Sequence, residues 1–282
     1  RAIFTLSMCH PMTSHLRPLC LAAFVALLAT HPADSMAQAI PLNGGNAVEN
    51  ESRQDPHQFD RAMDHFDHAH YTAALEGFDA YVQATLKSDG PAAERENTRR
   101  IEAEYHAALC AMFLFHKDAV WRIDRFIARH PESTWVPKLQ WELGNYQYRR
   151  KKWAKTIDAF NTLNPRKLAK GRRTEFYFKR GHALFEKGEL TLSRSDLLKV
   201  QGDAAASPEY LEAAQYYLAH IAYSEERLTT ALADFEALLL VDAFRNAVPV
   251  YIGQILFKLE RNAELTTRAP EWLGENFDLR KT

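Results

Sequence analysis

The stretch "WELGNYQYRRKKWAKTIDAF", residues 141–160, carries the pattern that decides the fold. Gly144 stands in the middle of one segment with apolar residues at three-and-four spacing, and Phe160 stands sixteen positions later in the next segment, with Thr156 four positions before it. Antiparallel helices approach to about 8–10 Å when a small side chain lies where they cross and a large one fills the space beside it. The stretch therefore predicts a helical hairpin.

The same pair of a small anchor residue and a large residue recurs along the chain, in Ala62 with Phe78, Ala107 with Ile123, Gly181 with Leu197, and Ala219 with Phe235. Short residues again stand four positions before the large ones, at Ala74, Ala119, Ser193 and Ala231. With Gly253 as a sixth anchor, successive anchors lie 45, 37, 37, 38 and 34 residues apart, the first spacing being lengthened by an insertion at 86–97. The sixth unit loses the pattern in its second helix, where "TRAP" (267–270) intervenes. A period in the mid-thirties predicts helical repeats rather than a non-repeating bundle.

Residues 141–160, "AALEGF" (73–78), "YYLAHIAYSEERLTTALADF" (216–235) and "ARHPES" (128–133) resemble tetratricopeptide repeats (TPRs). The resemblance covers residues 58–273 and implies an all-α fold, a TPR-like right-handed α-solenoid of about five to six helix-turn-helix repeats. With its leader included, the chain is similar to the N-terminal part of large exported multi-TPR proteins of Bacteroidetes-type bacteria.

The first 57 residues lie outside this pattern. "RPLCLAAFVALLAT" (17–30) places a basic residue before an apolar run, and Ala37 to Ala39 offers a small-x-small cleavage pattern. We interpret residues 1–39 as a signal peptide cleaved near Ala39; a short membrane anchor is the competing interpretation, but the run is below the roughly 20 residues that span a bilayer. Residues 40–57 are interpreted as a disordered linker, and residues 274–282 as a tail or the start of a further segment. We therefore expect an exported, periplasmic chain with no transmembrane segment after cleavage.

Composition narrows the classes of function. The chain has 46% apolar and 25% charged residues and a formal net charge of −1, so nothing global indicates binding to nucleic acid, and none is expected. After cleavage Cys110 is the one cysteine left, which excludes an intrachain disulfide and a cysteine metal cluster. Cys110 lies in the apolar run "AALCAMFLF" (107–115), where we expect a buried thiol.

The segment "DHFDHAHY", residues 64–71, raises the question of a metal site. Asp64, His65, Asp67 and His68 could present nitrogen and oxygen ligands from one helix face to zinc or nickel. In the repeat register, however, "DHAHY" (67–71) is the turn before the second helix, and short polar side chains are typical of such turns. We favour the turn and predict no bound metal.

Aromatic residues recur on one face of the first helix of several units. They stand three positions before and four after the anchor, as Phe59 and Phe66 do around Ala62, while the Ala107 unit breaks this pattern with Glu104 and Ala111. Polar residues directly follow four of the anchors, as Asn145, His182, His220 and Gln254. In the TPR family this face lines the groove that binds peptides, and rings interleaved with hydrogen-bonding groups suit a peptide. The candidate groove consists of Trp141, Asn145, Tyr148, Phe178, His182, Phe185, Tyr216, His220, Tyr223, Gln254 and Phe257. The competing interpretation is that the rings pack helix against helix.

Residues 149–173 contain ten Lys or Arg and a single acidic residue, Asp158. Such a segment could dock an acidic partner or an anionic surface of the cell envelope, or it could be a solvated helix end and loop. The candidate basic patch consists of Arg149, Arg150, Lys151, Lys152, Arg166, Lys167, Lys170, Arg172 and Arg173.

No motif for catalysis or for a cofactor accompanies these features: the sequence lacks G-x-S-x-G, H-E-x-x-H and a glycine-rich phosphate loop. We expect no enzyme activity and no cofactor. The sequence favours a scaffold that mediates protein–protein interaction in the bacterial envelope, with a protein or peptide partner on the aromatic face. The alternative is a solenoid arm of a larger envelope enzyme or of an outer-membrane assembly machine.

Overall fold

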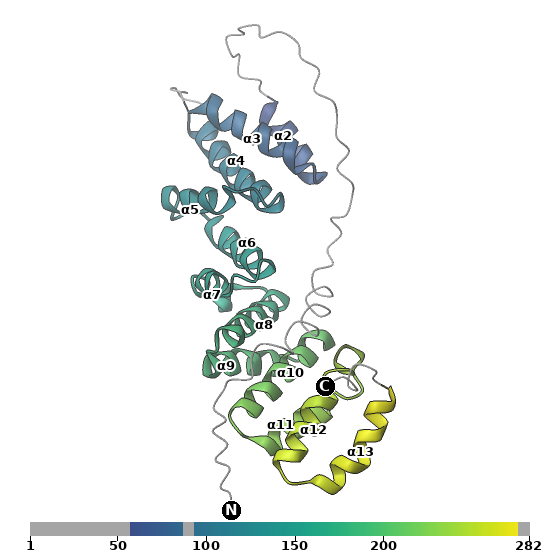
Figure 1. Ribbon diagram of the computed structural model, residues 1–282. Coiled ribbons are helices and arrows are strands. Elements are labelled where there is room, and N and C mark those ends of the chain that lie inside the picture. Colours follow the sequence, from purple (N-terminus) through teal and green to yellow (C-terminus); the bar gives the residue numbers. More distant parts are fainter. Residues whose placement is uncertain (1–56, 87–92, 276–282) are drawn as a thin grey trace, which may run out of the picture. The chain divides into compact units, whose positions relative to one another are not determined.

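The computed structural model describes residues 57–86 and 93–275, and these residues form an all-α structure without β-strands (Figure 1). The predicted signal peptide, all of the linker except His57, and the tail beyond residue 275 lie outside the described residues. The helices are α2 (Gln58–Asp67), α3 (Tyr71–Thr85), α4 (Ala93–Phe113), α5 (Ala119–Arg129), α6 (Val136–Arg149), α7 (Trp153–Asn161), α8 (Lys170–Lys187), α9 (Leu190–Gln201), α10 (Pro208–Ser224), α11 (Leu228–Glu236), α12 (Val248–Lys258) and α13 (Asn262–Glu275), with 3-10 turns η1 (Pro165–Lys167) and η2 (Asp242–Phe244).

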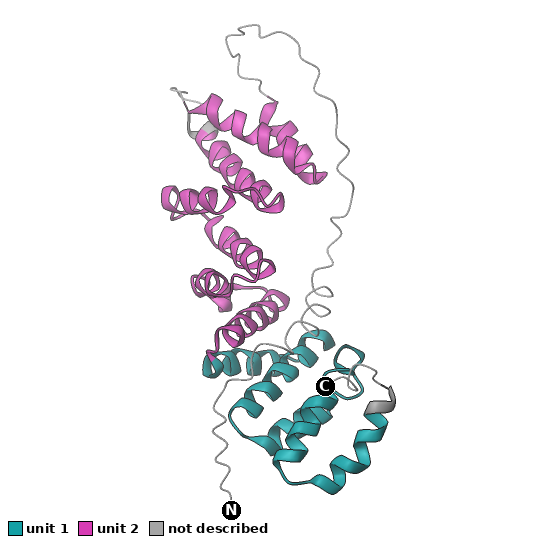
Figure 2. Cartoon of the chain, viewed as in Figure 1, with its two compact units in different colours: residues 1–37, 190–282 teal, residues 38–189 magenta. Residues whose placement is uncertain are grey.

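The described residues form two compact units, of which unit 2 comprises residues 57–86 and 93–189 and unit 1 comprises residues 190–275 (Figure 2). In unit 2, α2 to α8 each pack against the next helix in the chain, and α4 also contacts α6. In unit 1, α9 to α13 follow the same sequential scheme. Packing of each helix on its chain neighbours is the arrangement of a TPR-like helical repeat. The handedness of a superhelix through both units stays a prediction.

The predicted contact between small and large residues is confirmed where α6 crosses α7. A methyl group added to Gly144 would lie 2.5 Å from Cε1 of Phe160, and Phe160 has no exposed surface. In the first hairpin Gly77, beside Phe78, gives the close approach, because a methyl group there would lie 2.9 Å from Cβ of Ala62. The short residues that precede the large ones are all buried, at Ala74, Ala119, Thr156, Ser193 and Ala231.

Each first helix ends at a residue in the left-handed conformation, with φ of 58° at Ala69, 51° at Phe115, 54° at Lys151, 81° at Gly188, 56° at Glu226 and 58° at Glu260. This conformation ends a helix and reverses the chain, and glycine adopts it without strain. In five hairpins this residue lies seven positions after the predicted anchor, but Phe115 lies eight after Ala107. The register therefore makes Ala108 the second anchor, and Tyr105 rather than Glu104 stands three positions before it.

The sixth hairpin forms although its residue sizes are exchanged. Leu265 stands where the other repeats have a short residue, and Ala269 stands where they have a large one. A methyl group on Gly253 would lie 3.6 Å from Cδ1 of Leu265, so the leucine fills the crossing. The helix α13 continues through Pro270, and Arg268 ties it to α11 through an ion pair with Glu236. Among the described helices, none is long and apolar enough to cross a membrane.

Candidate functional site

Consecutive first helices are joined by hydrogen bonds between positions that the repeat register relates. In unit 2, Tyr148 on α6 and His182 on α8 share a hydrogen bond of 2.5 Å between Oη and Nδ1. In unit 1, the Tyr223 hydroxyl on α10 donates to Oε1 of Gln254 on α12 at 3.3 Å. Each bond joins the residue four after one anchor to the residue one after the next anchor. The first-helix positions of the candidate groove therefore do meet in pairs across neighbouring repeats.

In unit 2 the candidate groove residues are covered by the chain itself. Trp141, Asn145, Tyr148, Phe178, His182 and Phe185 are all buried. The Trp141 ring lies 5.8 Å from Phe160, and the Tyr148 ring lies 5.6 Å from Trp153. Nζ of Lys179 donates to Oδ1 of Asn145 at 2.8 Å. In this unit the side chains fill the spaces between helices, which favours the interpretation that the rings pack helix against helix; their role in binding stays a prediction.

His182 is held neutral by its surroundings. It is 1% exposed, and burial lowers its pKa below the ordinary value, while Glu186, whose Oε1 lies 3.7 Å from His182 Nε2, opposes that shift. A neutral imidazole can accept or donate toward Tyr148 according to its tautomer, whereas an imidazolium buried here would lack solvation.

Acidification is expected to weaken the fold through His182. The unfolded chain takes up a proton near pH 6.5, whereas burial lowers the pKa of His182 in the folded chain. The contribution of His182 to stability is therefore full above pH 6.5 and is lost as the pH falls below it, by at most about 1.4 kcal/mol per pH unit. Urea unfolding between pH 8 and about pH 5.5 measures this slope. A His182→Gln chain, which keeps a hydrogen-bonding partner for Tyr148, should lose less stability over the same interval. His106, whose pKa burial also lowers, contributes equally to both chains; identical slopes would contradict the assignment to His182.

In unit 1 part of the candidate groove remains accessible. Tyr216 is buried and stacks on Phe244 at 4.6 Å, and His220 is half-buried against Tyr251, whose ring is 4.4 Å away. Tyr223 and Gln254 are half-buried, and Phe257 is 69% exposed.

The accessible residues of α10 and α12 form one surface. Nζ of Lys258 lies 4.8 Å from the centroid of the Tyr223 ring, and Gln254, Phe257 and Lys258 share a face of α12 by their three-and-four spacing. We call Tyr223, Gln254, Phe257 and Lys258 the α10–α12 face. Lys258 is not among the residues predicted from the sequence, although its position four residues after Gln254 indicated a shared face.

The basic segment is divided into two clusters at opposite ends of α7. Arg149 to Lys152 form the turn between α6 and α7, whereas Arg166, Lys167, Lys170, Arg172 and Arg173 follow α7 or begin α8. A nine-residue helix separates the clusters, which corresponds to about 13 Å. Within the described part of the chain, none of these nine residues forms an ion pair. The single patch predicted from the sequence thus becomes two separate surfaces.

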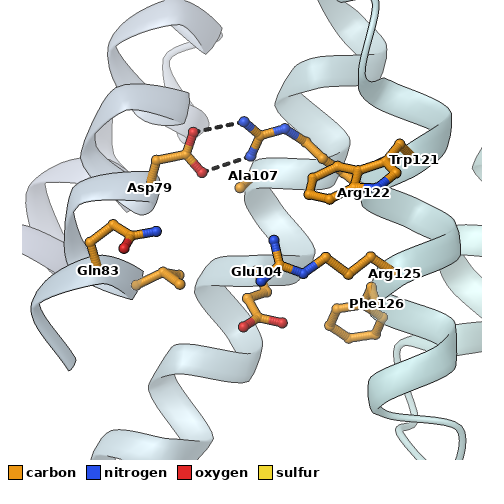
Figure 3. A pocket seen from close by; sticks show the side chains of 9 residues that line it. Asp79, Gln83, Glu104, Ala107, Trp121, Arg122, Arg125 and Phe126 are labelled. Atoms are coloured by element: carbon orange, nitrogen blue, oxygen red, sulfur yellow. Dashed lines mark hydrogen bonds and ion pairs between the residues drawn. The ribbon is translucent and has the colours of Figure 1, made fainter. Parts of the chain in front are cut away.

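A pocket of about 290 Å³ lies between α3, α4 and α5 (Figure 3). Arg122 crosses it with two hydrogen bonds to Asp79, of 2.7 and 2.9 Å, and a third of 2.7 Å to Asp118. These hydrogen bonds raise the pKa of Arg122 above its already high value. Trp121 is 56% exposed at the rim, and the Arg125 guanidinium lies 5.1 Å from its ring. This pocket was not predicted from the sequence, since three helices are needed to form it.

Residues 68–70 form the turn that was predicted at residues 67–71, and residues 64–67 belong to α2. The helix α2 ends at Asp67, and Tyr71 begins α3. In residues 57–86 and 93–275, no group of three or more His, Cys, Asp or Glu side chains is placed to hold a metal ion. Cys110 is buried as expected, and burial raises the pKa of its thiol to about 12, so it is a poor nucleophile.

Comparison with known proteins gives resemblances of fold alone. No protein-family model matches the sequence, and no curated protein is significantly similar to it. A tetratricopeptide repeat protein from Parabacteroides merdae is 12% identical with a TM-score of 0.49, over 78% of each chain. Kinesin light chain TPR-like repeats from Podospora anserina are 16% identical with a TM-score of 0.43, over 72% of this chain and 95% of that one. A TPR protein from Thermus thermophilus is 18% identical with a TM-score of 0.33, over 71% and 97%. At these scores no function is carried over, and the TPR-like fold rests on the helical hairpins described above.

Proposed function

We propose that the chain is a non-enzymatic scaffold that binds a protein or peptide partner through the α10–α12 face. The observation that carries this proposal is the exposure of Phe257, 69%, on the face where Tyr223 and Gln254 are hydrogen-bonded. An exposed ring beside a tyrosine, an amide and a cation supplies apolar area together with polar groups that orient a bound backbone.

The geometry suits a partner that lies across two repeats. The Tyr223–Gln254 hydrogen bond fixes two side chains before a partner arrives, which lowers the entropic cost of binding. Lys258 adds a positive charge whose nearest acidic group, Oε1 of Glu226, is 3.9 Å away and belongs to a side chain that is 81% exposed. The face therefore favours a segment with an apolar side chain and a nearby acidic group.

We place this scaffold in the periplasm, because the apolar run and the small-x-small pattern in residues 1–39 are typical of a secretory leader. The proposal assigns the chain no reaction. An arm-like role within a larger envelope assembly would use the same face and is included in the binding proposal.

Affinity capture from intact envelopes tests the proposal. The tagged chain and a Tyr223→Ala, Phe257→Ala variant are compared after crosslinking, with helix content checked by circular dichroism. A Leu240→Ala chain is the matched control, since Leu240 is 97% exposed and lies outside the α10–α12 face. We expect a defined partner to be recovered with the parent and the control and lost with the double variant. Equal recovery with all three chains would contradict the proposal.

A further inference from the structure

Two neighbouring turns of unit 2 expose apolar and basic side chains together. The turn between α4 and α5 exposes Leu114, at 38%, and Phe115, at 57%. It adjoins the turn between α6 and α7, because the Phe115 ring stacks on Tyr146 of α6 with 5.7 Å between the ring centroids. The Arg150 guanidinium also contacts Tyr146: it lies 5.2 Å from the ring centroid and donates to the hydroxyl at 2.6 Å. We call Leu114, Phe115, Lys117 and residues 149–152 the turn surface.

The turn surface carries positive charge, and the described part of the chain places no acidic group within ion-pair distance of its cations, although Arg149 acts electrostatically on Glu142. Lys117, Arg149, Arg150, Lys151 and Lys152 are exposed, and none of them forms an ion pair with another described residue. The acid within these two turns is Asp118, which already bonds His116 and Arg122. Five cations therefore face solvent together with an exposed leucine and phenylalanine.

Phe115 has a strained backbone conformation, and burial of its side chain does not compensate for that strain. Its φ of 51° is a conformation that bulky residues rarely adopt, and glycine occupies the equivalent position at Gly188. The ring nevertheless remains more than half exposed, so the folded chain gains little apolar burial from it. A glycine at this position would relieve the strain and remove the exposed ring at once.

We propose that the turn surface docks unit 2 on an anionic membrane surface. Leu114 and Phe115 would enter the interfacial layer of the lipid headgroups, and the five cations would lie against the lipid phosphates. Exposed aromatic and aliphatic side chains beside Lys and Arg are the composition that binds anionic bilayers. The three lysines among the five cations favour lipid over an acidic protein, because lysine is depleted at protein interfaces.

Flotation with lipid vesicles tests the proposal independently of any protein partner. The full chain is mixed with phosphatidylcholine vesicles with or without phosphatidylglycerol. Because every variant is tested as the full chain, the apolar run of the leader is common to all of them. Each cation near the surface is worth about fivefold in partitioning, so an Arg149→Gln, Lys151→Gln, Lys152→Gln chain should bind the anionic vesicles about a hundredfold more weakly. The matched control, Arg166→Gln, Lys167→Gln, Lys170→Gln, makes the same change of charge in the cluster beyond α7 and should bind nearly as the parent does.

A Phe115→Gly variant separates binding from folding. We expect it to unfold at a higher urea concentration than the parent, and yet to bind anionic vesicles severalfold more weakly. No preference of the parent for anionic vesicles would overturn the proposal. Equal losses of vesicle binding in the two triple variants would overturn it too, since they would indicate a general charge effect. Retention of the parent by an acidic peptide resin, without binding to vesicles, would also overturn it. None of these outcomes bears on the α10–α12 face.

Discussion

A Phe160→Ala chain is expected to unfold with a free energy about 3–5 kcal/mol lower than the parent. The Phe160 ring has no exposed surface and lies in a core cluster with Trp141, Leu163 and Phe176. Its removal deletes apolar contacts and leaves a cavity between α6, α7 and α8, because neighbouring helices collapse only in part. Urea unfolding followed by circular dichroism measures the change.

The matched control is Phe257→Ala, which removes an equal ring from a position that is 69% exposed and should change stability by no more than about 0.5 kcal/mol. Similar losses in the two chains would contradict the central packing role given to Phe160.

A Gly144→Ala chain is expected to lose about 1–3 kcal/mol, although alanine is the better helix former by about 1 kcal/mol. The added methyl group would lie 2.5 Å from Cε1 of Phe160, so the ring or the helix must move. Gly171→Ala is the matched control, because a methyl group at that position of α8 would have no atom within 4 Å. The control should be neutral or slightly stabilised.

The sign of the Gly144→Ala effect should reverse when Phe160 is alanine. In that background the methyl group fills part of the cavity, and the helix propensity of alanine is no longer opposed. A double-mutant cycle by urea unfolding tests this coupling. Additive effects of the two substitutions would show that Gly144 and Phe160 are not the contact that closes the hairpin.

The repeating hairpins were predictable from the sequence because they depend on residue size at a fixed spacing. Gly144 and Phe160 reveal the crossing of α6 and α7 without any knowledge of the rest of the fold. The turn at residues 67–71 was also predictable, because short polar residues interrupt the apolar period there. The register of the second hairpin was not, because two alanines, Ala107 and Ala108, both fit an anchor and the choice is made by the backbone at Phe115.

The solvent exposure of the candidate site residues could not be predicted from their spacing in the sequence. Tyr148 and Tyr223 occupy the same position in their repeats, yet Tyr148 is buried and Tyr223 half-buried, because Trp153 packs on Tyr148. The basic segment is continuous in sequence but is split by α7, and the pocket crossed by Arg122 draws on three helices. The exposure of a side chain, the division of the basic segment and the pocket all depend on the particular residues that neighbouring repeats contribute. The period of the sequence describes only the residue pattern that all repeats have in common.

The central claim, a partner-binding face on α10 and α12, is tested most directly by a photo-crosslinking side chain placed at Phe257 and, in a separate chain, at Leu240. Both positions are exposed, Leu240 even more than Phe257, so both probes are accessible, but only Phe257 lies on the α10–α12 face. Irradiation of intact envelopes should give a discrete adduct from position 257 and none from position 240. Adducts of equal yield from both positions, or none from position 257, would contradict the account.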